Sequence, residues 1–240
     1  MGKKDVTKSF AKAVESYESV LAIKPDYHQA KLYLVELFTM IPRDMGGDSI
    51  RAEKYVLELE SADIVLGAKA RDLILPDDAD RVEFWQKILK NNQNKTGINE
   101  ALGKAYLYED NVEEAKKCFE NEIRLDPNKN ILYVDIGRYY LMQAMQNRNK
   151  IDSLSTYVID AFEVYLNSKP EPINSMKAFA LGNQAMIKFQ SSDKEGGKVL
   201  QQKAESYDPN YSKAFGTPSK LLFDQPDKVS DAHSYFSRPF

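Results

Sequence analysis

Residues 99–127 read NEALGKAYLYEDNVEEAKKCFENEIRLDP, and the spacing within this stretch decides the fold class. Its first half places Leu102, Gly103 and Tyr106 on one stripe of a helix, because residues three and four apart are neighbours on a helix surface. Gly103 carries no side chain, so a second helix can approach the first at this position. The pattern therefore predicts a helix whose stripe contacts a partner helix.

The second half of the stretch supplies that partner helix. Ala115 and Phe119 are four residues apart, and we expect the small Ala115 to meet Gly103 while Phe119 fills the volume beside them. The polar turn 109–111 ends the first helix and offers a cap for the second. Pro127 then ends the second helix, because proline cannot continue helical hydrogen bonding. The whole stretch predicts one antiparallel helix hairpin.

The hairpin pattern returns along the chain. A shift of the first-helix pattern by 34 residues lands on Ile136, Gly137 and Tyr140, in register. Partial copies contain Ala13, Tyr17, Val20 and Pro25; Leu66, Gly67 and Ala79; and Leu181, Gly182, Gly197, Ala204 and Pro209. A repeat of this period predicts stacked hairpins, here about five and a half, that share one continuous core.

On these residues the chain resembles the tetratricopeptide repeat (TPR) family, from about residue 11 to residue 211. The resemblance implies an all-α fold: a right-handed superhelical array of antiparallel helix hairpins, a TPR-like α-solenoid, with an irregular C-terminal tail. Asn99 stands where the first helix of a TPR usually begins with an aromatic residue, so the array is divergent.

The predicted organisation is one repeat domain, 1–211, followed by a non-repeat tail, 212–240, that packs on the array. Within the domain we expect a half hairpin at 5–25, divergent hairpins at 28–61 and 62–93, the best repeat at 96–129, a lengthened hairpin at 130–170 and a last hairpin at 173–209. The tail contains Leu221, Phe223 and Phe236, which are costly to leave in water, so we expect it to cover the last hairpins or enter the concave groove.

Two insertions interrupt the repeat, and we expect specificity to reside there. In the turn 41–48, Asp48 can cap a helix that starts near Ser49, and the amides of Gly46 and Gly47 offer an anion cradle as the alternative to a plain turn. The second insertion, 140–161, predicts longer helices or an extra turn, because residues 143–150 are too polar for a core.

The turn Met45-Gly46-Gly47-Asp48 is also similar to turns of some bacterial exported TPR-like proteins, including components associated with tripartite transporters. This second resemblance covers four residues. It favours an exported or periplasmic protein whose signal segment is missing from the sequence. A cytoplasmic protein that starts with a single capping helix is the alternative.

Composition excludes several classes of partner. Charged residues make up 29% of the 240 residues, the net charge is −3, and no long run of one sign occurs, so we expect neither nucleic acid nor an anionic membrane as partner. No apolar run approaches the roughly 18 residues of a membrane span, which predicts a soluble chain without an integral membrane segment.

Few residues are suited to catalysis or metal binding. Cys118 is the only cysteine, and we expect a small buried residue there rather than a reactive thiol. We expect His28 to lie in the first turn of a helix. Asp77, Asp78 and Asp80 follow Pro76 and precede an apolar series, which favours helix capping over acid-base chemistry. We therefore expect no catalytic residue, no cofactor and no metal site.

Binding is the remaining function, on the concave face formed by the first helix of each hairpin. The candidate partner-binding residues on the two best copies are Lys104, Tyr108, Arg138 and Met142. The alternative for each is a structural role, for example an ion pair of Lys104 with Glu100. TPR domains that clamp a peptide carboxylate use basic and amide residues on these helices, and Glu100 and Asp135 depart from that set.

Three functional hypotheses follow. The leading one is a non-catalytic scaffold that binds a protein or peptide on its concave face. The second is an exported, transporter-associated or small-ligand-binding subunit, which would be favoured by an apolar cavity near residues 45–48. The third is a hydrolase, which would require Asp77, Asp78 or Asp80 to converge in a cleft with Trp85.

Overall fold

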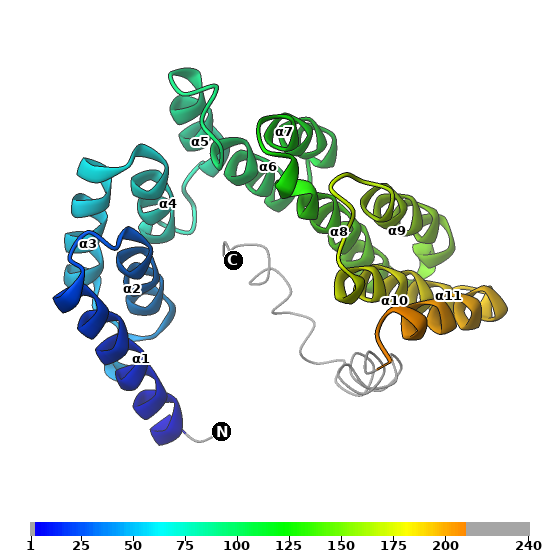
Figure 1. The fold of residues 1–240 in the computed structure, drawn as a ribbon, viewed down its shortest axis with the longest axis horizontal. Coiled ribbons are helices and arrows are strands. Elements are labelled where there is room, and N and C mark those ends of the chain that lie inside the picture. The colour runs from blue at the N-terminus through cyan, green and yellow to red at the C-terminus, as the bar shows by residue number, and fades with distance from the viewer. Residues whose placement is uncertain (1–2, 210–240) are drawn as a thin grey trace. The chain divides into compact units, whose positions relative to one another are not determined.

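A computed structural model describes residues 3–209, and within them the fold is all-α, which confirms that part of the predicted fold class. The α-helices are α1 (Lys3–Ile23), α2 (His28–Met40), α3 (Ser49–Ala62), α4 (Ile64–Ile74), α5 (Arg81–Lys90), α6 (Ile98–Tyr108), α7 (Val112–Leu125), α8 (Leu132–Gln146), α9 (Ile151–Leu166), α10 (Asn174–Gln190) and α11 (Lys194–Tyr207) (Figure 1). Short 3-10 turns stand at Arg43–Met45, Pro127–Ile131 and Arg148–Lys150. The predicted tail, 212–240, lies outside the described residues.

The chain divides into two compact units, Met1–Ala101 and Leu102–Phe240. The division falls inside α6 and inside the predicted repeat 96–129. Consecutive helices pack in neighbouring pairs within the units, as α2 with α3, α3 with α4, α8 with α9 and α10 with α11. The right-handed superhelix over the whole array stays a prediction.

The core of the first unit is formed by the four helices α1, α2, α3 and α4. Phe10 of α1 packs edge-on against Phe38 of α2, with ring centroids 6.2 Å apart. Leu34 on α2 and Val56 on α3 are fully buried in the same cluster, which Ala70 of α4 completes. Together with Val14 of α1 and with Ala52 and Leu59 of α3, they form a helical stripe on each of α1, α2 and α3, so the core follows from the apolar periodicity of the sequence.

In the second unit a glycine of one helix faces a phenylalanine of the next. A Cβ atom at Gly103 of α6 would lie 2.3 Å from Cε1 of Phe119 on α7, and one at Gly137 of α8 would lie 2.9 Å from the Phe162 ring of α9. The close approach predicted at Gly103 is therefore confirmed. The residue that occupies it is Phe119, whereas the sequence predicts Ala115 there; the large ring fills the space that the missing side chain leaves.

Acidic and amide side chains cap the helices where the sequence predicts caps. Asp48 accepts hydrogen bonds from the amides of Ile50 and Arg51 at the start of α3. Asp80 accepts from the amide of Glu83 in α5, and Asn111 caps α7 in the same way. Such caps satisfy amides that have no partner in the helix itself. The caps fix where these helices begin.

The second insertion is a longer helix followed by a tight turn. Helix α8 continues to Gln146, and a 3-10 turn, Arg148–Lys150, leads directly into α9. The sequence predicts longer helices or an extra turn for residues 140–161, and the structure has both. The extension adds Tyr157 to the surface of α9 at 53% exposure.

Candidate functional site

The four predicted partner-binding residues lie on two helices of the second unit. Lys104 and Tyr108 are one turn apart on α6, and Arg138 and Met142 are one turn apart on α8. Tyr108 is 42% exposed and the other three are partly exposed. Lys104, Tyr108 and Arg138 each take part in interactions within the molecule. The structure therefore gives these residues accessible surface, and their role in binding stays a prediction.

Asp110 ties the end of α6 to α8. Its Oδ1 accepts hydrogen bonds from the Tyr139 hydroxyl at 3.2 Å and from Gln143 Nε2 at 2.9 Å. Burial and the neighbouring carboxylate raise the pKa of Tyr139 to about 12, so the tyrosine donates as a neutral hydroxyl. Asp110 has φ 57°, in the left-handed region that residues other than glycine seldom adopt. Gln143 adjoins Met142, so the turn after α6 lies beside the predicted surface of α8.

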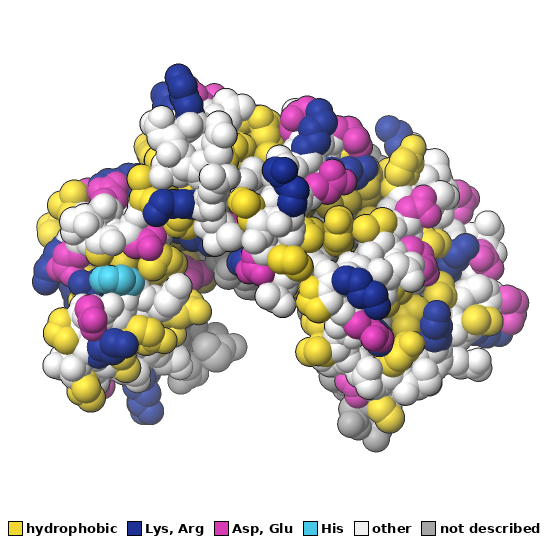
Figure 2. All heavy atoms as spheres, turned by 45° about the horizontal axis from the view of Figure 1, so that its top comes forward, with side chains coloured by type: hydrophobic (Ala, Val, Ile, Leu, Met, Phe, Trp, Pro, Cys, Tyr) yellow, Lys and Arg dark blue, Asp and Glu magenta, His cyan; other side chains and the backbone are white. Residues whose placement is uncertain are grey.

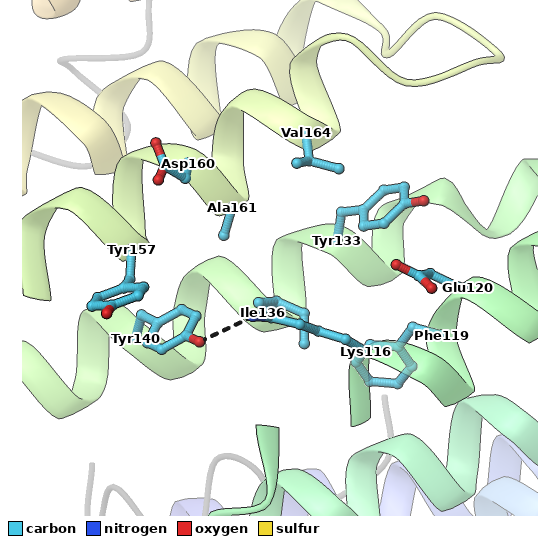
Figure 3. A pocket seen from close by; sticks show the side chains of 10 residues that line it. All are labelled: Lys116, Phe119, Glu120, Tyr133, Ile136, Tyr140, Tyr157, Asp160, Ala161 and Val164. Carbon is cyan, nitrogen blue, oxygen red and sulfur yellow. Dashed lines mark hydrogen bonds between the residues drawn. The ribbon is translucent and has the colours of Figure 1, made fainter. Parts of the chain in front are cut away.

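A cavity of about 230 Å³ lies between α7, α8 and α9 (Figure 3). Each helix contributes one stripe of side chains at helical spacing. The lining residues are Lys116, Phe119 and Glu120 of α7; Tyr133, Ile136 and Tyr140 of α8; and Tyr157, Asp160, Ala161 and Val164 of α9. Hereafter these ten residues are called the α7–α9 pocket. Phe119 is thus shared between the contact with Gly103 and the pocket wall.

Aromatic rings form one end of the α7–α9 pocket. Tyr140 and Tyr157 stack with ring centroids 5.2 Å apart and planes inclined by 24°. Lys116 Nζ lies 5.4 Å from the centroid of the Tyr140 ring and donates a hydrogen bond to the Tyr140 hydroxyl at 3.2 Å. The same ammonium forms an ion pair with Glu113 at 2.9 Å. Burial opposes the charge of Lys116, but the bonds to Glu113 and Tyr140 outweigh it and raise the Lys116 pKa.

Two carboxylates stand on the rim of the pocket. Glu120 of α7 and Asp160 of α9 are both exposed, and neither is paired with a cation within residues 3–209. Glu120 lies near Tyr133, whose pKa is raised by burial and by the charge of this carboxylate. The rim is therefore acidic, although acidic and basic side chains are intermixed over the face of the molecule in Figure 2.

The sequence does not predict the α7–α9 pocket. Its residues follow ordinary helical spacing, for example Tyr133, Ile136 and Tyr140 on one stripe of α8, and this pattern also fits a buried core. The local signal is chemical: charged residues, Lys116 and Glu120 on α7 and Asp160 on α9, stand on the same stripes as apolar and aromatic residues. The pocket requires three helices to meet, which no single stretch of sequence encodes.

The turn 41–48 is a plain turn with a helix cap. The amides of Gly46 and Gly47 donate to the carbonyls of Arg43 and Pro42, and the amide of Asp48 donates to the carbonyl of Phe38. These amides are already satisfied, so the anion-cradle alternative is wrong. Gly46 has φ 117° and lies against the Phe10 ring, which accounts for the glycine.

The acidic group before α5 does not meet Trp85. Asp77, Asp78 and Asp80 are all exposed, and Asp80 caps the helix. The Trp85 indole instead donates from Nε1 to Asp72 Oδ2 at 3.1 Å, a contact that sequence analysis missed.

Asp72 is held in an ion pair inside the first unit. Arg81 Nε lies 3.1 Å from Asp72 Oδ1. Burial raises the Asp72 pKa, while the bonds from Trp85 and Arg81 counteract part of this effect. The arrangement joins α4 to α5 and buries Trp85, which is 1% exposed.

Other candidate reactive groups have structural positions. Cys118 is 7% exposed, and burial raises its pKa to about 11, with a further contribution from Glu114. His28 is the first residue of α2, as the sequence predicts. In the described part of the chain, no three His, Cys, Asp or Glu side chains are grouped to hold a metal ion, and no helix there is long and apolar enough to cross a membrane.

Comparison with models of known protein families gives no match for this chain. A search of curated proteins also gives no match.

Proposed function

We propose that this chain is a non-catalytic, TPR-like interaction scaffold: a right-handed superhelical array of hairpins that binds a protein or peptide on the face of α6 and α8. One observation carries the proposal. The first helices of two successive pairs, α6 and α8, each carry two candidate residues that are one turn apart. Tyr108 is exposed, and Lys104, Arg138 and Met142 are partly exposed.

The fixed spacing of these helices supports a binding role. Gly103 against Phe119, and Asp110 against Tyr139, hold α6, α7 and α8 in one arrangement. A rigid surface loses little conformational entropy when a partner binds. Aromatic and arginine side chains are also those that contribute most to binding energy in protein interfaces.

The test is affinity capture from the native source with the full chain and with a Lys104→Ala/Tyr108→Ala/Arg138→Ala variant. A Tyr27→Ala variant is the matched control, since Tyr27 is 44% exposed and lies in the first unit. We expect the triple variant alone to lose a partner, with the helical circular dichroism of all proteins equal. An identical set of partners for all three proteins would contradict the proposal.

The alternative of an exported, transporter-associated or small-ligand-binding subunit has a different basis. It would be favoured by an apolar cavity near residues 45–48. The cavity between α7, α8 and α9 lies elsewhere in the chain, so it does not support this alternative.

A further inference from the structure

We propose that the α7–α9 pocket is a second binding site, separate from the α6 and α8 surface, and that it takes a basic side chain next to an aromatic one in a peptide segment. It adds a ligand chemistry that the scaffold proposal does not contain, and its test does not depend on that proposal. Three features of the pocket carry the argument: its size, its charge and the arrangement of its rings.

The size of the pocket fits one or two side chains. Its volume of about 230 Å³ is below the range of roughly 300–1,000 Å³ that is usual for sites of drug-sized ligands. Ala161 stands at the centre of the α9 stripe, and its methyl group leaves space between Tyr140 and Tyr133 (Figure 3). A longer side chain at this position would fill that space.

The charge of the pocket favours a cation. Lys116 is the one basic residue in the lining, and its charge is already matched by Glu113 at 2.9 Å. Glu120 and Asp160 remain as negative charges without a cationic partner in the described part of the chain, and they come from different helices, α7 and α9. A ligand cation between these helices would be attracted by both carboxylates, and salt would weaken that attraction.

The rings of the pocket suit the rest of such a ligand. The Tyr140 and Tyr157 stack presents an aromatic surface, and Tyr157 and Val164 of α9 are 53% and 50% exposed. Lys116 Nζ lies 5.4 Å from the centroid of the Tyr140 ring and is bonded to its hydroxyl, so a cation is already accommodated at the hydroxyl end of that ring. A guanidinium is attracted to the face of such a ring, and an aromatic neighbour in the peptide would cover exposed Tyr157 and Val164.

The probe is the peptide acetyl-Phe-Arg-amide, compared with acetyl-Phe-citrulline-amide, in which the arginine is replaced by an uncharged analogue of similar shape. The full chain is labelled with carbon-13 at the alanine methyl groups, and the Ala161 resonance is followed by NMR during titration. We expect the arginine peptide to shift this resonance saturably and to bind at least about fivefold more tightly than the citrulline peptide. We also expect its affinity to fall as salt is added.

Two double variants separate the role of the rim from that of net charge. Glu120→Gln/Asp160→Asn removes the rim charges, and Glu109→Gln/Glu195→Gln removes two exposed charges elsewhere in the second unit. We expect the first variant to bind the arginine peptide at least about fivefold more weakly, with its affinity for the citrulline peptide unchanged, and the second to bind as the unaltered chain does. All four altered residues are exposed, so we expect both variants to retain the fold.

A third variant tests the position of the ligand. Ala161→Leu fills the space, and we expect the shifts that the arginine peptide causes in the remaining alanine methyl groups to disappear. Equal affinity for the two peptides, equal loss in both double variants, or unchanged binding by Ala161→Leu would each overturn the proposal. So would a shift of the Ala161 resonance that follows protein concentration without peptide, since it would assign the pocket to a second copy of the chain.

Discussion

Gly103 of α6 lies against the ring of Phe119 in α7, so closely that a Cβ atom would stand 2.3 Å from the ring carbon Cε1. Gly137 and Phe162 form the same relationship between α8 and α9. Two hairpins of the second unit thus share one kind of contact, a glycine on one helix opposite a phenylalanine ring on the next. This contact fixes how close each pair of helices can come.

Replacement of Gly103 by alanine should therefore destabilise the second unit. Alanine favours a helix over glycine by about 1 kcal/mol, but overpacking of a close contact costs about 1–3 kcal/mol. We expect a net loss of about 1 kcal/mol in the free energy of unfolding, measured by urea titration with far-ultraviolet circular dichroism. Gly103→Ala/Phe119→Leu should lose less than the sum of its two single changes, because the smaller side chain makes room. A stabilised Gly103→Ala variant would show that the contact is looser.

Loss of the Asp48 cap should destabilise the first unit. Asp48→Ala removes the acceptor for two amides at the start of α3, and such a change typically costs about 1 kcal/mol. Trp85 is the only tryptophan of the chain and is buried in the first unit, so its fluorescence follows the unfolding of that unit. Asp48→Asn is the matched control, since asparagine also caps, and it should stay close to the unaltered protein. Equal losses for the two variants would assign the effect to something other than the cap.

Asp72 should make the stability of the first unit depend on pH in a direction opposite to that of most acids. Its folded pKa is raised, chiefly by burial, so the folded state holds the proton over a range of pH where the unfolded state has released it. Stability due to Asp72 is therefore lost as pH rises from the ordinary aspartate pKa of about 3.9 through the raised value. The Asp72→Asn variant keeps an acceptor for the Trp85 indole and lacks this titration.

The comparison needs urea midpoints from Trp85 fluorescence at several values between pH 4 and pH 7. We expect the stability of Asp72→Asn relative to the unaltered protein to increase as pH rises. Glu60, whose pKa is lowered by its hydrogen bond from Arg71, has the opposite effect but is present in both proteins. A difference that is constant with pH, or that shrinks, would contradict the raised pKa of Asp72.

Cys118 should react slowly with thiol reagents in the folded protein. With a pKa of about 11, only about a thousandth of the thiol is ionised at pH 8, against roughly a quarter for a free cysteine with a pKa near 8.5. Burial adds a steric barrier. We expect labelling by iodoacetamide to be at least about 100-fold slower than in urea-unfolded protein, and Gly103→Ala to accelerate it by loosening α7. Labelling at the rate of an unfolded thiol would overturn this expectation.

Local features of this fold could be predicted from sequence. Asp48 and Asp80 cap helices as predicted, since a cap requires only the few residues that follow it. The close approach at Gly103 was also predictable, but its occupant was not. The choice between Ala115 and Phe119 depends on how the second helix rotates, and helical spacing alone does not fix that rotation.

Features that depend on distant contacts could not be predicted. Asp72 and Trp85 are on either side of the turn between α4 and α5, and no spacing rule joins them. The anion cradle at Gly46 and Gly47 failed because carbonyls of Pro42 and Arg43 accept the amides. The α7–α9 pocket needs α8 and α9 to meet α7, so its acidic rim became visible only in three dimensions.

The bonds from Tyr139 and Gln143 to Asp110 limit how far this protein can be treated as a set of interchangeable modules. The turn after α6 takes its shape from Asp110, which has φ 57°. The two side chains that donate hydrogen bonds to Asp110 belong to α8, in the hairpin that follows. Duplication or transplantation of residues 98–125 alone would separate the turn from those donors. In the evolution or engineering of this chain, the smallest portable segment would extend at least to Gln143.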